Sequence, residues 1–176
     1  MTVPLSLVLE LQFIRVCYCD MGGFSTRDAS PTVGTLQTDE QARQIHLASI
    51  KEVLNQVPKG SMDDQAKSAA KQVILKLKDL DSVTDMGVNY QDYPTYVRNV
   101  RFELNRFSDQ YSQYSSLIAA FQLCLDPHVQ AQSFFNKYVR MRRGTMGEGE
   151  SRFYLHNSWV TGHESIKIVE SQLQEI

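Results

Sequence analysis

The chain has 176 residues, of which 42% are hydrophobic and 22% charged, and its formal net charge is −2. A chain of this length is typical of a single domain and can bury enough surface to fold without a disulfide or a metal. The composition excludes a disordered, collagen-like or polytopic membrane protein. The net charge also argues against a protein that coats nucleic acid through its overall charge.

The N-terminal part, residues 1–37, is predicted to be an apolar segment followed by a linker. Residues 3–19 are strongly apolar, but Glu10, Gln12 and Arg15 interrupt them, so we expect no membrane span. The segment also lacks the features of a secretory signal. Strand, helix and a misassigned start codon are all open interpretations of it, and so is peripheral contact with a membrane.

The three cysteines do not form the pattern of a disulfide framework. Cys17 and Cys19 are separated by one residue, which is too short for an ordinary structural bridge. We expect free thiols, which slightly favour a cytoplasmic location. Cys124 lies beside predicted core positions and is expected to be a buried, inert thiol.

The rest of the chain, residues 38–176, is predicted to form the helical domain. A capping box with Thr38 as N-cap opens a helix that runs to about Val57. Ser61 is predicted to cap a second helix, whose apolar stripe ends at Leu80. Because a short connection joins these two helices, we expect them to pack antiparallel to each other.

A regular heptad repeat follows and predicts one long helix from about Asp92 to Leu125. At a rise of 1.5 Å per residue this helix would be about 50 Å long. The dipeptide Asp126-Pro127 is predicted to end it and to start the next helix. Serine is a mediocre helix former, so continuity of the long helix through Ser108–Ser116 is left open. The repeat consists of Tyr93, Val97, Val100, Leu104, Phe107, Tyr111, Tyr114, Ile118, Phe121 and Leu125.

Two further helices are predicted near the C-terminus. The first ends at Gly144, and an acidic loop over residues 144–151 follows it. The second covers about residues 163–175. Together these patterns predict an all-α, up-and-down bundle of four to five helices with one long central helix.

The apolar side of the long helix carries the main functional prediction. A helix of that length would extend about 20 Å beyond the first two helices, so another element must cover its apolar residues. Later helices of the same chain are one candidate, and a protein partner or a second copy of the chain is the other. The candidate partner surface comprises Tyr93, Tyr111, Tyr114 and Phe121. We therefore expect a non-enzymatic protein that acts through protein–protein interaction, as a scaffold, adaptor or accessory subunit.

A basic helix end gives a second functional hypothesis. Lys137, Arg140, Arg142 and Arg143 form a candidate contact for an anion or a nucleic acid. The competing interpretation is a basic C-terminus that complements its helix dipole. Because no pattern of an RNA-binding module accompanies these residues, we expect no nucleic-acid partner.

No catalytic, metal or cofactor site is predicted. The four histidines, His46, His128, His156 and His163, show no ligand spacing typical of a metal site. No nucleophile motif of a known hydrolase is present in the sequence. A small-molecule-binding or catalytic bundle with a site between its helices is kept as the remaining alternative.

Overall fold

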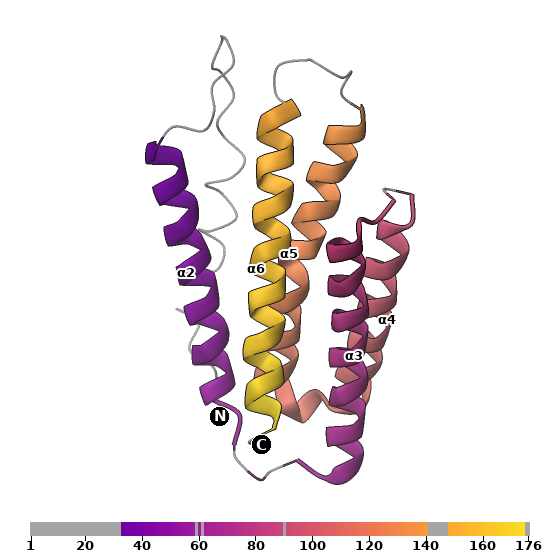
Figure 1. The fold of residues 1–176 in the computed structure, drawn as a ribbon. Coiled ribbons are helices and arrows are strands. Elements are labelled where there is room, and N and C mark those ends of the chain that lie inside the picture. Colours follow the sequence, from indigo (N-terminus) through magenta and orange to yellow (C-terminus); the bar gives the residue numbers. More distant parts are fainter. Residues whose placement is uncertain (1–32, 59, 61, 90, 141–147, 175–176) are drawn as a thin grey trace.

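A computed structural model describes residues 33–174 except for 59, 61, 90 and 141–147. In this part the chain is all-α, and consecutive helices alternate in direction, which confirms the predicted up-and-down bundle (Figure 1). The elements are α2 (Val33–Asn55), α3 (Asp64–Met86), α4 (Tyr93–Gln110), the short 3₁₀ helix η1 (Ser112–Tyr114), α5 (Ser115–Arg140) and α6 (Glu148–Leu173).

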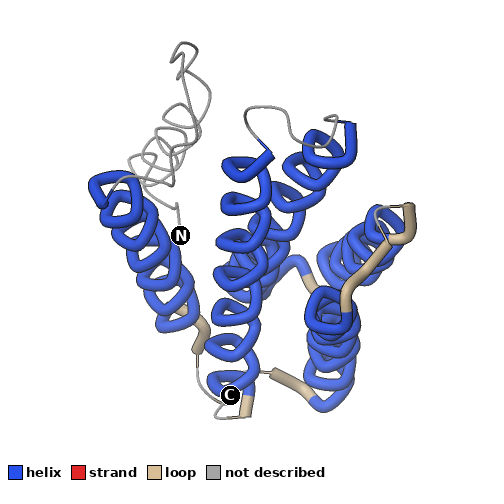
Figure 2. Tube along the Cα trace, turned by 45° about the horizontal axis from the view of Figure 1, so that its top comes forward, coloured by secondary structure: helices blue, strands red, loops and turns tan. Residues whose placement is uncertain are grey.

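The α5–α6 pair forms the centre of the bundle. Helix α2 lies against one side of this pair, and the α3–α4 pair lies against the other (Figures 1 and 2). Within the described residues α2 and α3 do not contact each other, so the predicted antiparallel packing of the first two helices is wrong. Each of the two helices packs against α6 instead, and Val57 and Met62 in their connection are both buried in the core.

The helix starts differ from the predicted ones. Helix α2 begins at Val33, so Thr38 lies within the helix and is not its N-cap. The N-cap of α3 is Asp63, whose carboxylate accepts a hydrogen bond from the backbone N–H of Ala66 at 2.7 Å. The predicted cap, Ser61, and the predicted N-terminal segment up to residue 32 lie outside the described residues.

The predicted long helix is instead two helices, α4 and α5, which fold back on each other. Tyr111 leaves the helical conformation with φ −132° and ψ 41°, and η1 completes the turn. The heptad repeat continues through the turn, so the apolar faces of both helices point to the same core. The ring centroids of Phe107 in α4 and Phe121 in α5 are 5.6 Å apart in an edge-to-face arrangement.

The predicted break at Pro127 is also wrong, because α5 continues through this proline to Arg140. Proline has no N–H, so the carbonyl of Leu123, four residues earlier, loses its helical donor. Nε2 of His46 in α2 donates to that carbonyl at 3.1 Å. The neighbouring helix thus supplies the hydrogen bond that proline removes.

Helix α6 begins at Glu148, well before the predicted start of the last helix at His163. Buried residues of α2, α3, α4, α5 and α6 join one hydrophobic cluster. Among the residues that the structure describes, no helix combines the length and the apolar character needed to cross a membrane.

Candidate functional site

Three polar side chains meet in the core where α4, α5 and α6 come together. The indole N–H of Trp159 donates to the hydroxyl oxygen of Tyr93 at 3.1 Å. The Tyr93 hydroxyl donates to the backbone carbonyl of His128 at 3.3 Å and lies 3.1 Å from Nδ1 of the same residue. Tyr93 and His128 are fully buried, so these bonds satisfy polar atoms that have no access to water. Burial raises the pKa of Tyr93, and the negative charge of Asp81 adds to this increase.

The His128 ring packs against the backbone of α6 at Gly162. A Cβ atom at position 162 would lie 2.4 Å from Nε2 of His128, so only glycine leaves room for the ring. Nε2 has no hydrogen-bond partner among the described residues. Burial, and to a smaller extent the charge of His163, lower the pKa of His128 to about 4. The ring is therefore neutral at physiological pH.

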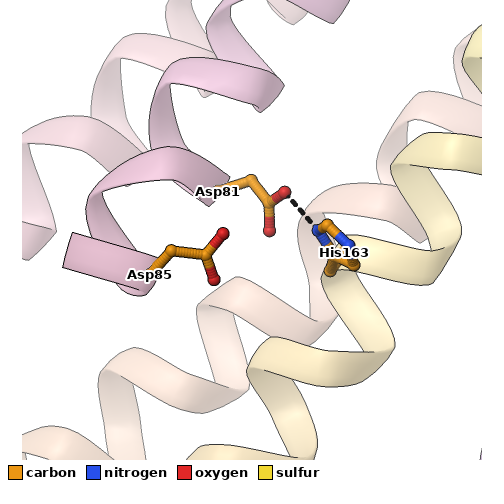
Figure 3. Close-up of side chains that lie close together, drawn as sticks. All are labelled: Asp81, Asp85 and His163. Carbon is orange, nitrogen blue, oxygen red and sulfur yellow. Dashed lines mark hydrogen bonds and ion pairs between the residues drawn. The ribbon is translucent and has the colours of Figure 1, made fainter. Parts of the chain in front are cut away.

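Two aspartates and a histidine come together between the C-terminal part of α3 and α6 (Figure 3). Nδ1 of His163 donates to Oδ2 of Asp81 at 2.6 Å. The side chain of Asp81 is 14% exposed and that of His163 is 38% exposed, whereas Asp85 is open to solvent. One ligand atom from each of the three residues lies within 4.8 Å of the other two. The cluster thus places two carboxylates and one imidazole around a common point.

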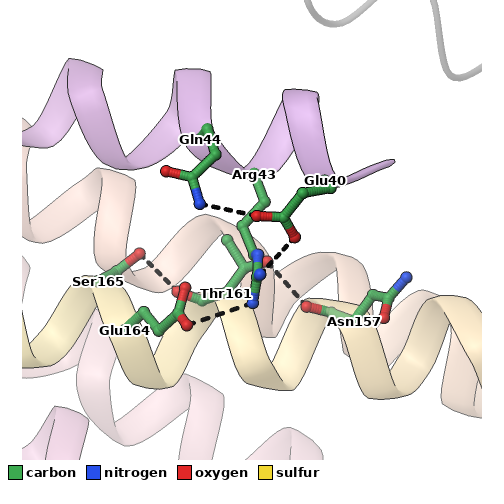
Figure 4. Close-up of polar contacts among 7 residues, drawn as sticks. All are labelled: Glu40, Arg43, Gln44, Asn157, Thr161, Glu164 and Ser165. Carbon is green, nitrogen blue, oxygen red and sulfur yellow. Dashed lines mark hydrogen bonds and ion pairs between the residues drawn. The ribbon is translucent and has the colours of Figure 1, made fainter. Parts of the chain in front are cut away.

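Arg43 joins α2 to α6 (Figure 4). Its guanidinium contacts Glu40 on its own helix and Oε1 of Glu164 on α6, the latter at 3.2 Å. The side-chain amide of Gln44 donates to Glu40 at 2.8 Å, and this bond, together with Arg43, lowers the pKa of Glu40. On α6, Thr161 donates to the carbonyl of Asn157 at 2.8 Å, and Ser165 donates to that of Thr161 at 2.7 Å (Figure 4).

An open hollow of about 280 Å³ lies next to this contact, lined by Arg43, Phe153, His156 and other residues of α2 and α6. The only arginine of its lining is already paired with two carboxylates. An arginine in that state has little remaining charge to offer an anionic ligand. We therefore assign no ligand to this hollow.

The outer face of α4 presents an aromatic ring among arginines. Phe102 is 66% exposed. Arg98 and Arg106 lie one helical turn before and after it, and Arg101 is adjacent in sequence. Arg106 lies 3.6 Å from Glu103, whereas Arg98 and Arg101 form no ion pair with any residue that the structure describes. We call Arg98, Arg101, Phe102 and Arg106 the α4 outer face.

The four residues of the predicted partner surface lie in the interior or at its edge. Tyr93 and Phe121 are fully buried, so they contribute nothing to the exposed surface of the folded chain. Tyr111 and Tyr114 are half-buried in the turn between α4 and α5, and their rings lie 6.5 Å apart. The apolar side of the repeat is thus covered largely by other helices of the same chain.

The predicted anion contact lies almost entirely outside the described residues. Lys137 is exposed near the end of α5. The Arg140 side chain is outside the described part, and so are Arg142 and Arg143. This predicted contact therefore stays a prediction.

Sequence reasoning missed the cluster of Asp81, Asp85 and His163. The predicted apolar stripe of the second helix ended at Leu80, so both aspartates were left beyond it. A helix continued to Met86 would have placed the two carboxylates one turn apart on one face. Their pairing with a residue 82 positions later in the chain has no local sequence signal.

A scan against protein-family models finds no match to this chain, and searches of curated proteins and of solved structures find none either.

Proposed function

We propose that the chain is a non-enzymatic helical-bundle protein that binds an acidic protein partner through the α4 outer face. The observation that carries the proposal is Phe102, which is 66% exposed and has Arg98, Arg101 and Arg106 at neighbouring positions of its helix. Single exposed apolar residues are common on protein surfaces. An exposed ring within a group of arginines is more informative, because aromatic residues and arginine are enriched at protein interfaces.

The position of Phe102 on its helix supports this assignment. A helix turns about 100° per residue, so Phe102 lies opposite the buried stripe that includes Val100, Leu104 and Phe107. The side chain therefore points away from the bundle, where it contributes nothing to the core. Burial of a side chain of this size against a partner would contribute about 2 kcal/mol of binding free energy.

The charges of the α4 outer face favour an acidic partner. Arg98 and Arg101 are exposed and form no ion pair with the described residues, so their guanidinium groups are available to carboxylates. Arginine forms bidentate hydrogen bonds with carboxylates, which gives such contacts geometric specificity. We therefore expect the partner to present acidic side chains around an apolar pocket that receives Phe102.

Photo-cross-linking tests the proposal directly. p-Benzoylphenylalanine is placed at position 102 or, as the control, at Leu75, which is 50% exposed on α3. After irradiation in an extract of the native source, we expect one dominant adduct from position 102, with a protein of acidic surface. Charge reversal of Arg98 and Arg101 to Glu should remove that adduct, because the attraction of opposite charges becomes repulsion.

A matched charge reversal controls for the change in net charge. Lys67 and Lys71 lie on α3 and form no ion pair with described residues. Their replacement by Glu should leave the adduct at position 102 intact. Equal adducts from positions 102 and 75 would contradict the proposal. A nucleic-acid adduct or an adduct with a second copy of the chain would contradict it as well.

A further inference from the structure

We propose that Asp81, Asp85 and His163 bind a divalent transition-metal ion, with zinc as the ion that suits them best. This proposal is independent of the α4 outer face, which includes none of these residues. The first supporting observation is convergence: one potential ligand atom from each residue lies within 4.8 Å of the other two. Figure 3 shows the three side chains turned toward one another from two helices.

The helices explain why these atoms converge. Asp81 and Asp85 are four residues apart on α3, so their carboxylates lie on one face in successive turns. His163 faces them from α6, which packs against α3. The ring is already oriented by its hydrogen bond to Asp81. The ligand atoms are thus held by two packed helices, which lowers the cost of arranging them for an ion.

A second observation independently indicates a missing partner. Oδ1 of Asp81 is buried and has no hydrogen-bond partner among the described residues. A buried carboxylate oxygen without a partner is costly, because it has lost its water and gained nothing in exchange. Asp85 adds a second negative charge nearby, and His163 can offset only one of the two charges. A bound cation would satisfy the orphan oxygen and relieve the repulsion between the carboxylates.

The donor set selects the class of ion. Imidazole nitrogen suits zinc and related transition metals, whereas magnesium and calcium prefer oxygen donors alone. Three protein ligands leave one position of a tetrahedral zinc ion for water. Ligation requires a neutral imidazole with a free lone pair. Nδ1 of His163 now carries the proton that it donates to Asp81, so ligation through Nδ1 needs a ring protonated on Nε2 instead. In a neutral ring the proton moves from Nδ1 to Nε2, and a doubly protonated ring releases its Nδ1 proton to solvent. The ion would link the C-terminal part of α3 to α6.

Isothermal titration calorimetry with zinc chloride tests the site in the full-length chain. Cys17 and Cys19 are replaced by Ser in all samples, because thiolates also bind zinc. We expect one ion per chain, and Asp85→Asn should weaken its affinity by about tenfold or more. Asp85 is exposed and forms no hydrogen bond or ion pair with described residues, so this variant should fold normally. Asp109→Asn on α4, with the same change in charge at another exposed position, should bind zinc like the parent.

The histidine ligand is tested with a second matched pair. His163→Gln should abolish the visible absorption bands of a four-coordinate cobalt(II) ion bound in place of zinc. His156→Gln, which changes an exposed histidine of the same helix, should retain them. Zinc affinity that is equal in Asp85→Asn and Asp109→Asn would overturn the proposal. Cobalt bands that survive His163→Gln would overturn it too.

Discussion

The side chain of His128 combines a hydrogen-bonding contact with close packing against a neighbouring helix. The ring lies against Gly162, where a Cβ atom would be only 2.4 Å from Nε2. On its other side the ring meets the Tyr93 hydroxyl, which Trp159 also contacts. The neutral ring fits this site, whereas a charged ring would be buried without a carboxylate partner. The site therefore holds the histidine in one protonation state.

This protonation state predicts a pH dependence of stability. The pKa of His128 in the folded chain is about 4, below the ordinary value of 6.5. Its contribution to stability is therefore fully present above pH 6.5 and is lost as the pH falls toward 4, because the unfolded chain binds the proton first. The loss amounts to about 3 kcal/mol of unfolding free energy. Urea unfolding at a series of pH values between 7 and 4 measures it.

The non-titrating variant His128→Gln provides the comparison for this pH dependence. Both proteins share the contributions of their carboxylates and other histidines, so the difference between their slopes isolates residue 128. We expect the unfolding free energy of the variant to fall less steeply across this range. Parallel slopes in the two proteins would show that His128 titrates normally in the fold.

At the scale of elements, the periodicity of the sequence predicted which residues are buried but not where the helices end. Tyr93, Val97 and Leu104 are buried as the heptad repeat indicated, because the repeat marks one side of a helix. The sequence pattern did not predict the turn at Tyr111, because the heptad repeat continues in phase on both sides of it. The continuation through Pro127 also escaped detection, because its compensating donor, His46, comes from a residue 77 positions away from Leu123.

The role of His46 in α5 is testable by a double-mutant cycle. His46→Leu removes the donor to the Leu123 carbonyl, and this should destabilise the chain by about 1–2 kcal/mol. In a Pro127→Ala background the new N–H at position 127 can donate to the same carbonyl. We therefore expect the cost of His46→Leu to fall by about 1 kcal/mol in that background. Chemical denaturation of the four proteins measures the coupling.

An equal cost of His46→Leu in both backgrounds would show that the hydrogen bond does not compensate for proline. The cycle itself corrects for the loss of imidazole packing, because that loss is common to both backgrounds. Burial lowers the pKa of His46, so its donation to Leu123 does not need a charged ring.

At the scale of the whole molecule, the all-α class and the alternating direction of the helices were predictable from the sequence. Which helices pack against each other was not. Sequence proximity suggested that the first two helices pack together, whereas the α5–α6 pair separates them. This order follows from long-range burial, including that of Val57 and Met62 in the connection. In this arrangement the apolar side of the heptad repeat faces the core, where Tyr93 and Phe121 are buried. We therefore place the proposed partner surface on the outer side of α4.

The candidate surface thus moves from the apolar side of the heptad repeat to the α4 outer face, and the local sequence pattern does not predict this change. Phe102 lies outside the heptad repeat, so its sequence position gives no sign of a role in packing. Its significance comes from exposure in the folded chain, together with Arg98 and Arg101, which form no ion pairs in the described part. Whether an aromatic side chain is exposed or covered by another helix becomes clear only when all the helices are packed together.

The central claim, that Phe102 anchors an acidic protein partner, is tested most directly by affinity. The partner identified by cross-linking is titrated with the wild-type chain, with Phe102→Ser and with Leu75→Ser, which changes an exposed apolar residue of α3. We predict that Phe102→Ser weakens binding by about tenfold or more, as for a central interface residue. Leu75→Ser should leave the affinity within about twofold of wild type. An unchanged affinity for Phe102→Ser, or an equal loss in both variants, would contradict the claim.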